Sequence, residues 1–273
     1  MLEAQEKKDS IKQKEIEQVV LIGYGAKKKS DLTGSITALS EKDFNKGAIT
    51  SAEGLLNGRT SGVVVTQSGT PGNDAVIRVR GGSSLLSSND PLIVIDGLPV
   101  EGGLSSINPN DIESFSILKD ASSTAIYGNR GSNGVILITT KKGSKKKLQV
   151  SFNSFTTYNT LAKNVDVYNG DQFREIINTM APDKANLLGT ANTNWQDLIF
   201  RNTASFDSNL SLMGNLFDKI PSRLSIGHTE NEGLLLTSNY KRSTASFTLN
   251  PTLFDNHLKL NISGNYTYAF RTN

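Results

Sequence analysis

The second half of the chain contains five segments, each of about ten residues, in which apolar and polar side chains alternate. In the first segment Leu148, Val150 and Phe152 alternate with glutamine, serine and asparagine. A strand has a period of two, so this pattern puts the apolar side chains on one face and the polar side chains on the other. The other four segments follow the same pattern, around residues 206–212, 223–226, 244–249 and 258–268.

Strands with one apolar and one polar face are typical of a transmembrane β-barrel, whose apolar side faces lipid and whose polar side faces a lumen. The polar face here is rich in Asn, Ser and Thr, and Tyr266, Tyr268 and Phe270 lie at one strand end as an interfacial girdle would. The strands of a soluble β-sandwich also alternate, so a soluble α+β binding module followed by a β-sandwich is the alternative. A long connection, residues 159–203, contains helical pieces near 171–180 and 195–200.

The first half of the chain has a different pattern, in which short strands and short helices are separated by many glycines. The continuous apolar run at residues 92–95 predicts a strand that is buried on both faces. Thr70-Pro71-Gly72-Asn73 predicts a turn, since proline presets φ and glycine accepts a positive φ. The pattern predicts a small α+β domain with a mixed sheet, with strands at 62–66, 75–80, 92–95, 112–118 and 135–140 and helices at 52–57 and 121–127.

The start of the chain combines a polar leader with a short apolar segment. Residues 1–18 are dense in Glu, Lys and Gln, and we expect them to form a mobile leader. Val19, Val20, Leu21 and Ile22 follow and favour a strand. This segment suits strand addition to the sheet edge of a partner, and it equally suits an ordinary first strand.

Composition excludes several classes of site. The chain has no cysteine, so disulfides and Cys-ligated metals are excluded, and its two histidines lack metal-ligand spacing. The net charge is only +3, and no aromatic platform interleaves the lysine clusters at 27–29 and 145–147, which favours solvated turns over nucleic-acid binding. No apolar run reaches 18 residues, so no transmembrane helix is expected. The first residues have no apolar core, so we expect that an export signal has been removed or that the sequence is a fragment.

No motif predicts catalysis or a cofactor. The glycine-rich segment 128–134 follows a helix and precedes a strand, the reverse of a phosphate-binding loop, and it lacks the Gly-Lys-Ser/Thr ending. Asp96, Asp111 and Asp120 have no catalytic partner at a recognisable spacing, and they are expected in turns or as local caps. A glycan hydrolase would need a pair of carboxylates in a cleft, and no candidate pair is evident. We therefore expect a protein that is not an enzyme and has no cofactor.

Three arginines of the first half are candidates for holding loops together. Arg78, Arg80 and Arg130 lie in a glycine-rich domain, where guanidinium groups usually make forked bonds to carboxylates and carbonyls. If this domain sits inside a polar barrel, the same arginines are expected to pair with acidic groups on the barrel wall.

A long, ordered series of motifs resembles the plug domain of the TonB-dependent outer-membrane transporters of the SusC/RagA-like class. The most specific are Pro91-Leu92-Ile93-Val94-Ile95-Asp96-Gly97-Leu98-Pro99, Leu118-Lys119-Asp120-Ala121-Ser122-Ser123-Thr124-Ala125-Ile126-Tyr127-Gly128 and Arg130-Gly131-Ser132-Asn133-Gly134-Val135-Ile136. The resemblance assigns residues 19–143 to the plug and residues 144–273 to the N-terminal part of the β-barrel. It is weaker past the plug, where Asn194-Trp195-Gln196-Asp197 and the strand patterns look like the opening of the family's barrel.

The resemblance also implies partners and a role. In this family TonB acts near the segment that corresponds to residues 19–22, a SusD-like surface lipoprotein forms a lid, and glycans, oligosaccharides or peptides cross the outer membrane. The resemblance makes plug structure or plug retention the expected role of a set of residues in this domain: Arg78, Arg80, Asp96, Gly97, Asp120, Tyr127, Arg130 and Gly131. Large plugged barrels have about 22 strands, and five cannot close. We therefore expect a truncated gene product, an incomplete sequence or a remnant that does not transport alone.

Overall fold

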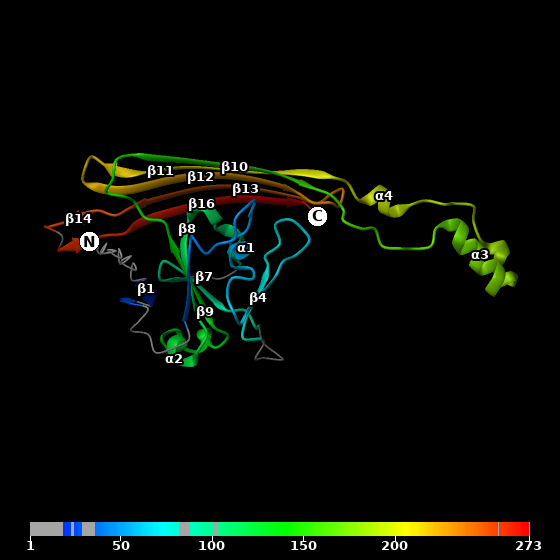
Figure 1. Cartoon of the computed structure of the whole chain (residues 1–273), viewed down its shortest axis with the longest axis horizontal. Helices are drawn as coiled ribbons and strands as arrows, with labels where there is room; N and C mark the ends of the chain where they lie inside the picture. Colours follow the sequence, from blue (N-terminus) through cyan, green and yellow to red (C-terminus); the bar gives the residue numbers. More distant parts are fainter. Residues whose placement is uncertain are drawn as a thin grey trace, which may run out of the picture.

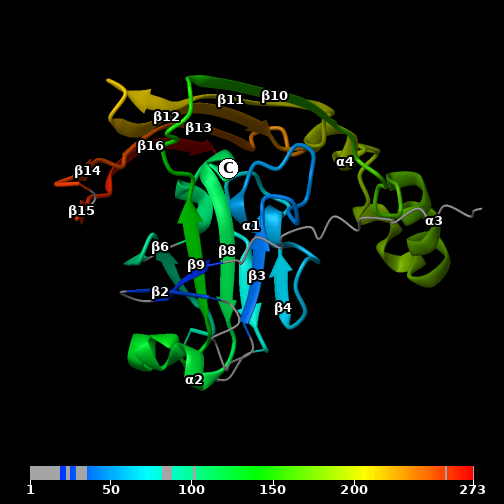
Figure 2. The same ribbon diagram turned by 60° about the vertical axis from the view of Figure 1, so that its left-hand side comes forward.

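A computed structural model describes residues 19–22, 25–28, 36–81, 88–100, 103–255 and 257–272 of the 273-residue chain. The predicted leader, residues 1–18, lies outside the described residues. Two units are packed together: a compact inner domain, residues 36–143, and a curved sheet above it, which we call the wall sheet (Figure 1). The strands of the inner domain run steeply across those of the wall sheet (Figure 2).

The inner domain is built on a mixed five-stranded sheet in the order β3-β8-β9-β6-β7. Its strands are β3 (Ile36–Ser40), β6 (Leu92–Ile95), β7 (Leu98–Val100), β8 (Ile112–Leu118) and β9 (Val135–Thr140). β6 and β9 are parallel and the other pairs are antiparallel. The mixed sheet is confirmed, while β3 and β7 are strands that the sequence pattern did not predict.

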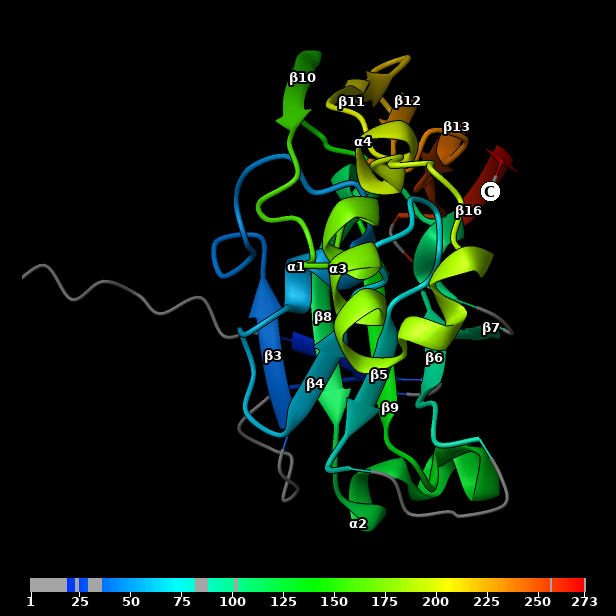
Figure 3. The same cartoon turned by 90° about the vertical axis from the view of Figure 1, so that its right-hand side faces the viewer.

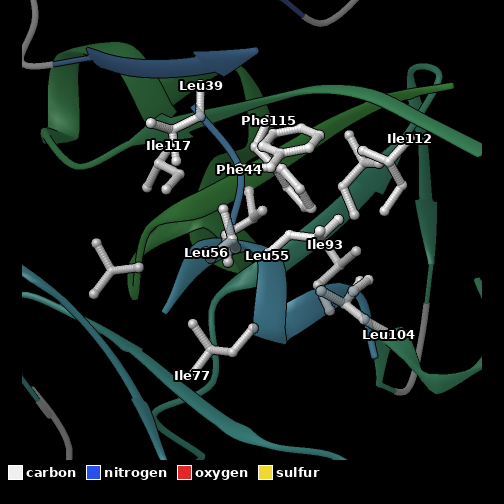
Figure 4. Close-up of a cluster of buried hydrophobic side chains, with 14 residues drawn as sticks. Leu39, Phe44, Leu55, Leu56, Ile77, Ile93, Leu104, Ile112, Phe115 and Ile117 are labelled. Carbon is white, nitrogen blue, oxygen red and sulfur yellow. The ribbon is translucent and has the colours of Figure 1, made fainter. Parts of the chain in front are cut away.

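Both faces of this sheet are buried, which explains the continuous apolar runs in β6 and β9. Ile93, Ile136 and Ile138 belong to the cluster on one face, together with Phe115, whose ring meets that of Phe44 edge-on at a centroid distance of 5.4 Å (Figure 4). The alternate residues of the same strands, including Leu92, Val94, Val135 and Leu137, form a second cluster. Period-two pleating therefore places successive residues in two cores.

Smaller elements surround the inner sheet. Helix α1 (Ala52–Leu56) covers the larger cluster, and β4 (Val63–Thr66) pairs with β5 (Val76–Val79). The helix predicted at 121–127 is split into α2 (Ala121–Thr124), at the end furthest from the wall sheet (Figure 3), and a 3-10 segment, η4 (Ala125–Gly131). Two further 3-10 turns, η2 (Leu104–Ser106) and η3 (Pro109–Asp111), precede β8.

The N-terminal apolar segment forms a hairpin of its own. β1 (Val19–Ile22) pairs antiparallel with β2 (Gly25–Lys28), and neither strand joins the sheet of the inner domain. One backbone edge of β1 is therefore used within the chain.

The wall sheet confirms the five predicted alternating segments. Its antiparallel strands, in sequence order, are β10 (Gln149–Asn159), β11 (Thr203–Leu216), β12 (Ile220–Glu232), β13 (Asn239–Leu249) and β16 (Ile262–Thr272). The fifth segment begins later than predicted, because Leu258–Lys259 (β15) pairs with Thr252–Leu253 (β14) in a separate hairpin.

The two faces of the wall sheet differ as the alternation predicts. The row Phe152, Leu210, Ile226, Ala245 and Tyr266 runs across all five strands on the face away from the inner domain, and these side chains are exposed. The opposite face covers the inner domain and buries Ser, Thr, Asn, Asp and Arg side chains. An exposed apolar face and a buried polar face together suit a sheet between lipid and a polar interior.

The connection between β10 and β11 carries helices α3 (Gly170–Met180) and α4 (Trp195–Ile199) with a 3-10 turn, η5 (Pro182–Leu187), and extends beyond the sheet (Figure 1). α3 starts with a capping box, in which Asn169 accepts from the Gln172 N–H at 2.9 Å and Gln172 accepts from the Asn169 N–H at 3.0 Å. Within the described ranges no helix has the length and apolar character needed to cross a membrane. We call the end of the wall sheet that carries this connection its long-loop end.

Candidate functional site: the polar interface between the inner domain and the wall sheet

The interface between the inner domain and the wall sheet is held by charged and polar side chains. Arg223 on β12 and Arg242 on β13 occupy polar-face positions of the alternation, and they are only 4% and 2% exposed. Both arginines point into the interface because their neighbours in sequence, one residue away, are outward-facing. Their partners in the inner domain lie in the segment of η2 and η3 and just before α1.

Asp111 forms the central ion pair of the interface. Arg223 Nη2 donates to Asp111 Oδ1 at 2.7 Å, and Ser246 Oγ donates to Asp111 Oδ2 at 2.8 Å. The turn η3 positions this carboxylate, because Asn108 caps it by accepting from the Asn110 N–H at 2.9 Å. Asp111 is itself 7% exposed, so the pair is buried on both sides. Such a pair is costly to break from one side only, because the remaining charge stays buried.

Arg242 donates to backbone carbonyls of the inner domain, whereas Arg223 donates to a carboxylate. Its Nη1 donates to the carbonyl of Ser105 at 2.8 Å and to that of Ile107 at 3.3 Å, and its Nη2 donates to the carbonyl of Thr50 at 2.9 Å. One guanidinium group thereby joins the start of α1 and the segment around η2 to β13. The planar fork of arginine suits this task, which a lysine ammonium does not reproduce.

Neutral hydrogen bonds extend the interface to neighbouring strands. Asn108 Nδ2 donates to Thr244 Oγ1 at 3.0 Å, and Thr267 Oγ1 donates to the Ser106 carbonyl at 2.8 Å. Gly227 leaves room for the first of these contacts, because a Cβ at this position would lie 2.2 Å from Asn108 Nδ2. A cavity of about 260 Å³ adjoins Asp111 and Arg223 and is lined mainly by polar side chains. Polar walls of this kind accept water, so the bonds of this interface can be exchanged for bonds to solvent.

Most of the residues that the sequence predicted to hold the inner domain to the wall make their contacts within the inner domain. Arg80 forms an ion pair with Asp120, so it meets an acidic group of its own domain and not one of the wall. Asp96 accepts from the Thr140 N–H at 2.9 Å and from its hydroxyl at 2.6 Å, and Gly97 completes the turn from β6 to β7 with φ of 90°. These contacts fix the fold that presents Asp111.

The remaining expected residues have other places. Tyr127 packs against the second apolar cluster, and Gly131 is buried, with the Thr124 carbonyl 2.9 Å from where a Cβ would lie. Arg78 and Arg130 are exposed. Arg80 was expected to pair with an acidic group of the wall. At the interface the charges are placed the other way round, because the wall supplies arginines and the inner domain supplies the acid.

Sequence reasoning missed Asp111 as an interface residue and treated it as a local cap. The available signal was on the wall, where Arg223 interrupts a face composed mainly of Asn, Ser and Thr. A charge at an inward position of such a face requires a partner opposite it. The position of that partner depends on how the two units dock.

Lys119, beside the Arg80–Asp120 pair, shows how the inner domain satisfies a partly buried cation. Its Nζ donates to Thr37 Oγ1 at 2.8 Å and to the Ser61 carbonyl at 2.6 Å. Burial and the neighbouring Arg80 lower the pKa of Lys119, and Asp120 opposes that shift. In the described part of the chain no group of three or more His, Cys, Asp or Glu side chains is arranged to hold a metal ion.

Comparison with known proteins identifies relatives of both units. Residues 28–135 match the family model of the TonB-dependent receptor plug domain. The TonB-dependent receptor SusC of Bacteroides thetaiotaomicron is 48% identical over 262 residues, which cover 92% of this chain and 26% of that relative. The TonB-dependent receptor P26 of Formosa agariphila is 38% identical over 275 residues, covering 94% of this chain and 27% of the relative. The chain thus spans about a quarter of the length of these curated relatives.

Solved structures agree with these matches. The structure of the RagAB peptide transporter superimposes with a TM-score of 0.76 at 25% identity, covering 88% of this chain and 31% of that chain. The siderophore receptor PirA from Pseudomonas aeruginosa has a TM-score of 0.56 at 16% identity, covering 87% of this chain and 36% of that chain, and shares the fold alone.

Proposed function

We propose that the chain belongs to the SusC/RagA-like TonB-dependent transporters and forms the plug and the first five wall strands of an outer-membrane importer of glycans, oligosaccharides or peptides. The observation that carries the proposal is the polar interface between the two units. A domain that must stay seated and yet rearrange requires contacts that are specific but exchangeable with water. The Asp111–Arg223 pair and the carbonyl contacts of Arg242 meet both needs.

In this proposal the N-terminal hairpin transmits force to the inner domain. TonB binds near Val19, Val20, Leu21 and Ile22 by strand addition, where main-chain hydrogen bonds supply the affinity. The next described strand is β3, which lies at an edge of the inner sheet and pairs only with β8. A pull from the N-terminal side therefore acts first on an edge strand, whose few ladder bonds separate more readily than those of a central strand.

The other partners follow from the two surfaces of the wall. The exposed apolar face contacts outer-membrane lipid, and a SusD-like surface lipoprotein covers the long-loop end, where the solute enters. The family comprises transporters, and we propose that the chain acts without a catalytic step and without nucleic acid. Turnover of oligosaccharides by the purified protein would contradict this assignment.

The test is capture of the chain by TonB. Deleting residues 16–25 should abolish capture, because the deletion removes the proposed strand-addition segment. Deleting residues 5–14 is the matched control, since it shortens the polar leader by the same length and leaves that segment in place. Unchanged capture after the first deletion would refute the proposed TonB contact.

Membrane partitioning tests the alternative of a soluble binding module with a β-sandwich. The exposed apolar row of the wall sheet requires detergent or lipid, and we expect the chain in the detergent phase. Full recovery in the aqueous phase without detergent would favour the soluble alternative.

A further inference from the structure

A second cavity lies at the long-loop end of the interface. It has a volume of about 220 Å³, is partly open to solvent and is lined by the loop 67–75, the start of α1 and the ends of β10, β12 and β13. Its walls are polar, and they include the carboxylates of Glu53 and Asp74. It is separate from the cavity beside Asp111 and admits a group the size of one sugar or amino-acid unit.

Glu53 is the unusual feature of this cavity. It is 1% exposed, and its Oε2 has no hydrogen-bond partner. The side chain is buried because its neighbours in α1, Ala52, Leu55 and Leu56, pack into the main apolar cluster. A buried carboxylate oxygen without a donor is costly, so an unmatched one that lines a cavity indicates a missing partner.

Asp74 places a second carboxylate at the same cavity. Asp74 Oδ1 accepts from the Ser105 N–H at 3.1 Å. Gly103 makes room for this carboxylate, because a Cβ there would lie 2.0 Å from Asp74 Cγ. The absence of a side chain at residue 103 therefore leaves the space that the Asp74 carboxylate occupies.

Arg242 is the cation among the described residues that line this cavity. Its two terminal nitrogens donate to carbonyls, including those of Ser105 and Thr50, and its buried Nε has no hydrogen-bond partner. Burial raises the pKa of Glu53, the Asp74 carboxylate adds to the rise, and backbone groups together with the Ser51 hydroxyl oppose it. Glu53, Asp74 and Glu232 line the cavity together with Arg242, so the acidic side chains outnumber the basic ones among its described lining residues.

We propose that this cavity binds the ammonium group of a solute, with Glu53 and Asp74 as its acceptors. An ammonium has three donors and no acceptor, so it supplies both the missing hydrogen bond and the missing charge. Stacking of a sugar ring is disfavoured, because Gly72 covers the ring of Tyr240: a Cβ on Gly72 would lie 2.2 Å from Tyr240 Cδ2. The inference rests on the proposed function and narrows its substrate to solutes that carry a primary amine.

The test compares glucosamine with glucose, two probes of the same ring size that differ in one ammonium group. Binding is measured by ligand-observed NMR on the full chain in detergent micelles, at a pH where glucosamine is protonated. A charge-assisted hydrogen bond to a buried carboxylate predicts that glucosamine binds about tenfold more tightly or better. Equal binding of the two probes, or binding of neither, would overturn the proposal.

Matched variants test whether Glu53 and Asp74 cause the preference for glucosamine. Glu53→Gln and Asp74→Asn keep the size of each side chain, and each should reduce the preference for glucosamine several-fold. Glu41→Gln is the control, because Glu41 is an exposed inner-domain acid that pairs with Lys141 at 2.9 Å and is not among the residues that line this cavity. A preference for glucosamine that persists in both cavity variants would refute the proposal. If Glu53→Gln does not fold, Asp74→Asn by itself provides the test.

The outcome is independent of the test of the proposed function. A chain that TonB captures but that binds both probes alike refutes only the ammonium site. A chain that prefers glucosamine but is not captured refutes only the TonB contact.

Discussion

The Asp111–Arg223 contact offers the sharpest test of how the inner domain is held to the wall. Asp111→Asn keeps the size of the side chain but removes its charge, which leaves the Arg223 guanidinium buried without a counter-charge. Both side chains are nearly inaccessible, at 10% for Asp111 and 3% for Arg223. Removing one partner of a buried pair costs about 3–5 kcal/mol. The free energy of unfolding of the docked inner domain should therefore fall by an amount in that range.

A double-mutant cycle separates the pair from its surroundings. Arg223→Met leaves the carboxylate unpaired and should cost a similar amount, whereas the double variant has no buried charge. We expect the double variant to be less destabilised than the sum of the single variants by about 2 kcal/mol or more. The assay is hydrogen exchange of inner-domain amides across a urea series, with the chain in detergent micelles.

A more accessible pair provides the control for this cycle. Arg80 and Asp120 form an ion pair whose side chains are 51% and 26% exposed. Asp120→Asn makes the same chemical change there and should cost less than about 1 kcal/mol. If Asp111→Asn costs no more than Asp120→Asn, or if the two interface changes simply add, the pair does not hold the inner domain.

Three further predictions concern the same interface. Arg242→Lys keeps the charge but loses the planar guanidinium group, so it should destabilise docking by about 2 kcal/mol or more. Hydrogen exchange at residues 103–107 should become faster, and unchanged exchange there would contradict the prediction. Gly72→Ala should lower the melting temperature more than Gly58→Ala does. The reason is that φ is positive at both glycines (75° and 70°), but only Gly72 lies against an aromatic ring. Equal decreases in melting temperature would refute the steric argument. Burial raises the pKa of Glu53 above its ordinary 4.5, so the folded state holds this proton more tightly than the unfolded state does. Its contribution to stability is therefore greatest below 4.5 and is lost as pH rises toward the raised pKa, and Glu53→Gln should abolish that slope in thermal melts; an identical slope in the variant would show another group to be responsible.

Much of the architecture was predictable because it depends on local periodicity. The alternation in the second half fixed the number of wall strands and the face that each side chain occupies. The apolar run Leu92–Ile95 indicated a strand covered on both faces, as the two clusters confirm.

The elements that the pattern missed have weak local signals. β3 (Ile36–Ser40) is an edge strand in which only Leu39 is buried, so its sequence has no clear period. β7 (Leu98–Val100) is three residues long, too short for a period to be read. The prediction of a helix at 121–127 did not take into account that Gly128 follows directly, with a non-helical φ of 59°. The α-helix therefore ends at Thr124 and continues as a 3-10 segment.

By itself, the sequence determined which residues face inward on the wall and which segments form the inner core, because both follow from spacings of a few residues. The tertiary structure alone decided the partners. Asp111 meets Arg223 across 112 positions, and Arg242 reaches the Thr50 carbonyl across 192. No local period encodes such pairs, since they depend on the angle and depth at which the inner domain docks. The same holds for the cavity at Glu53, whose walls come from both units and exist only once these are together.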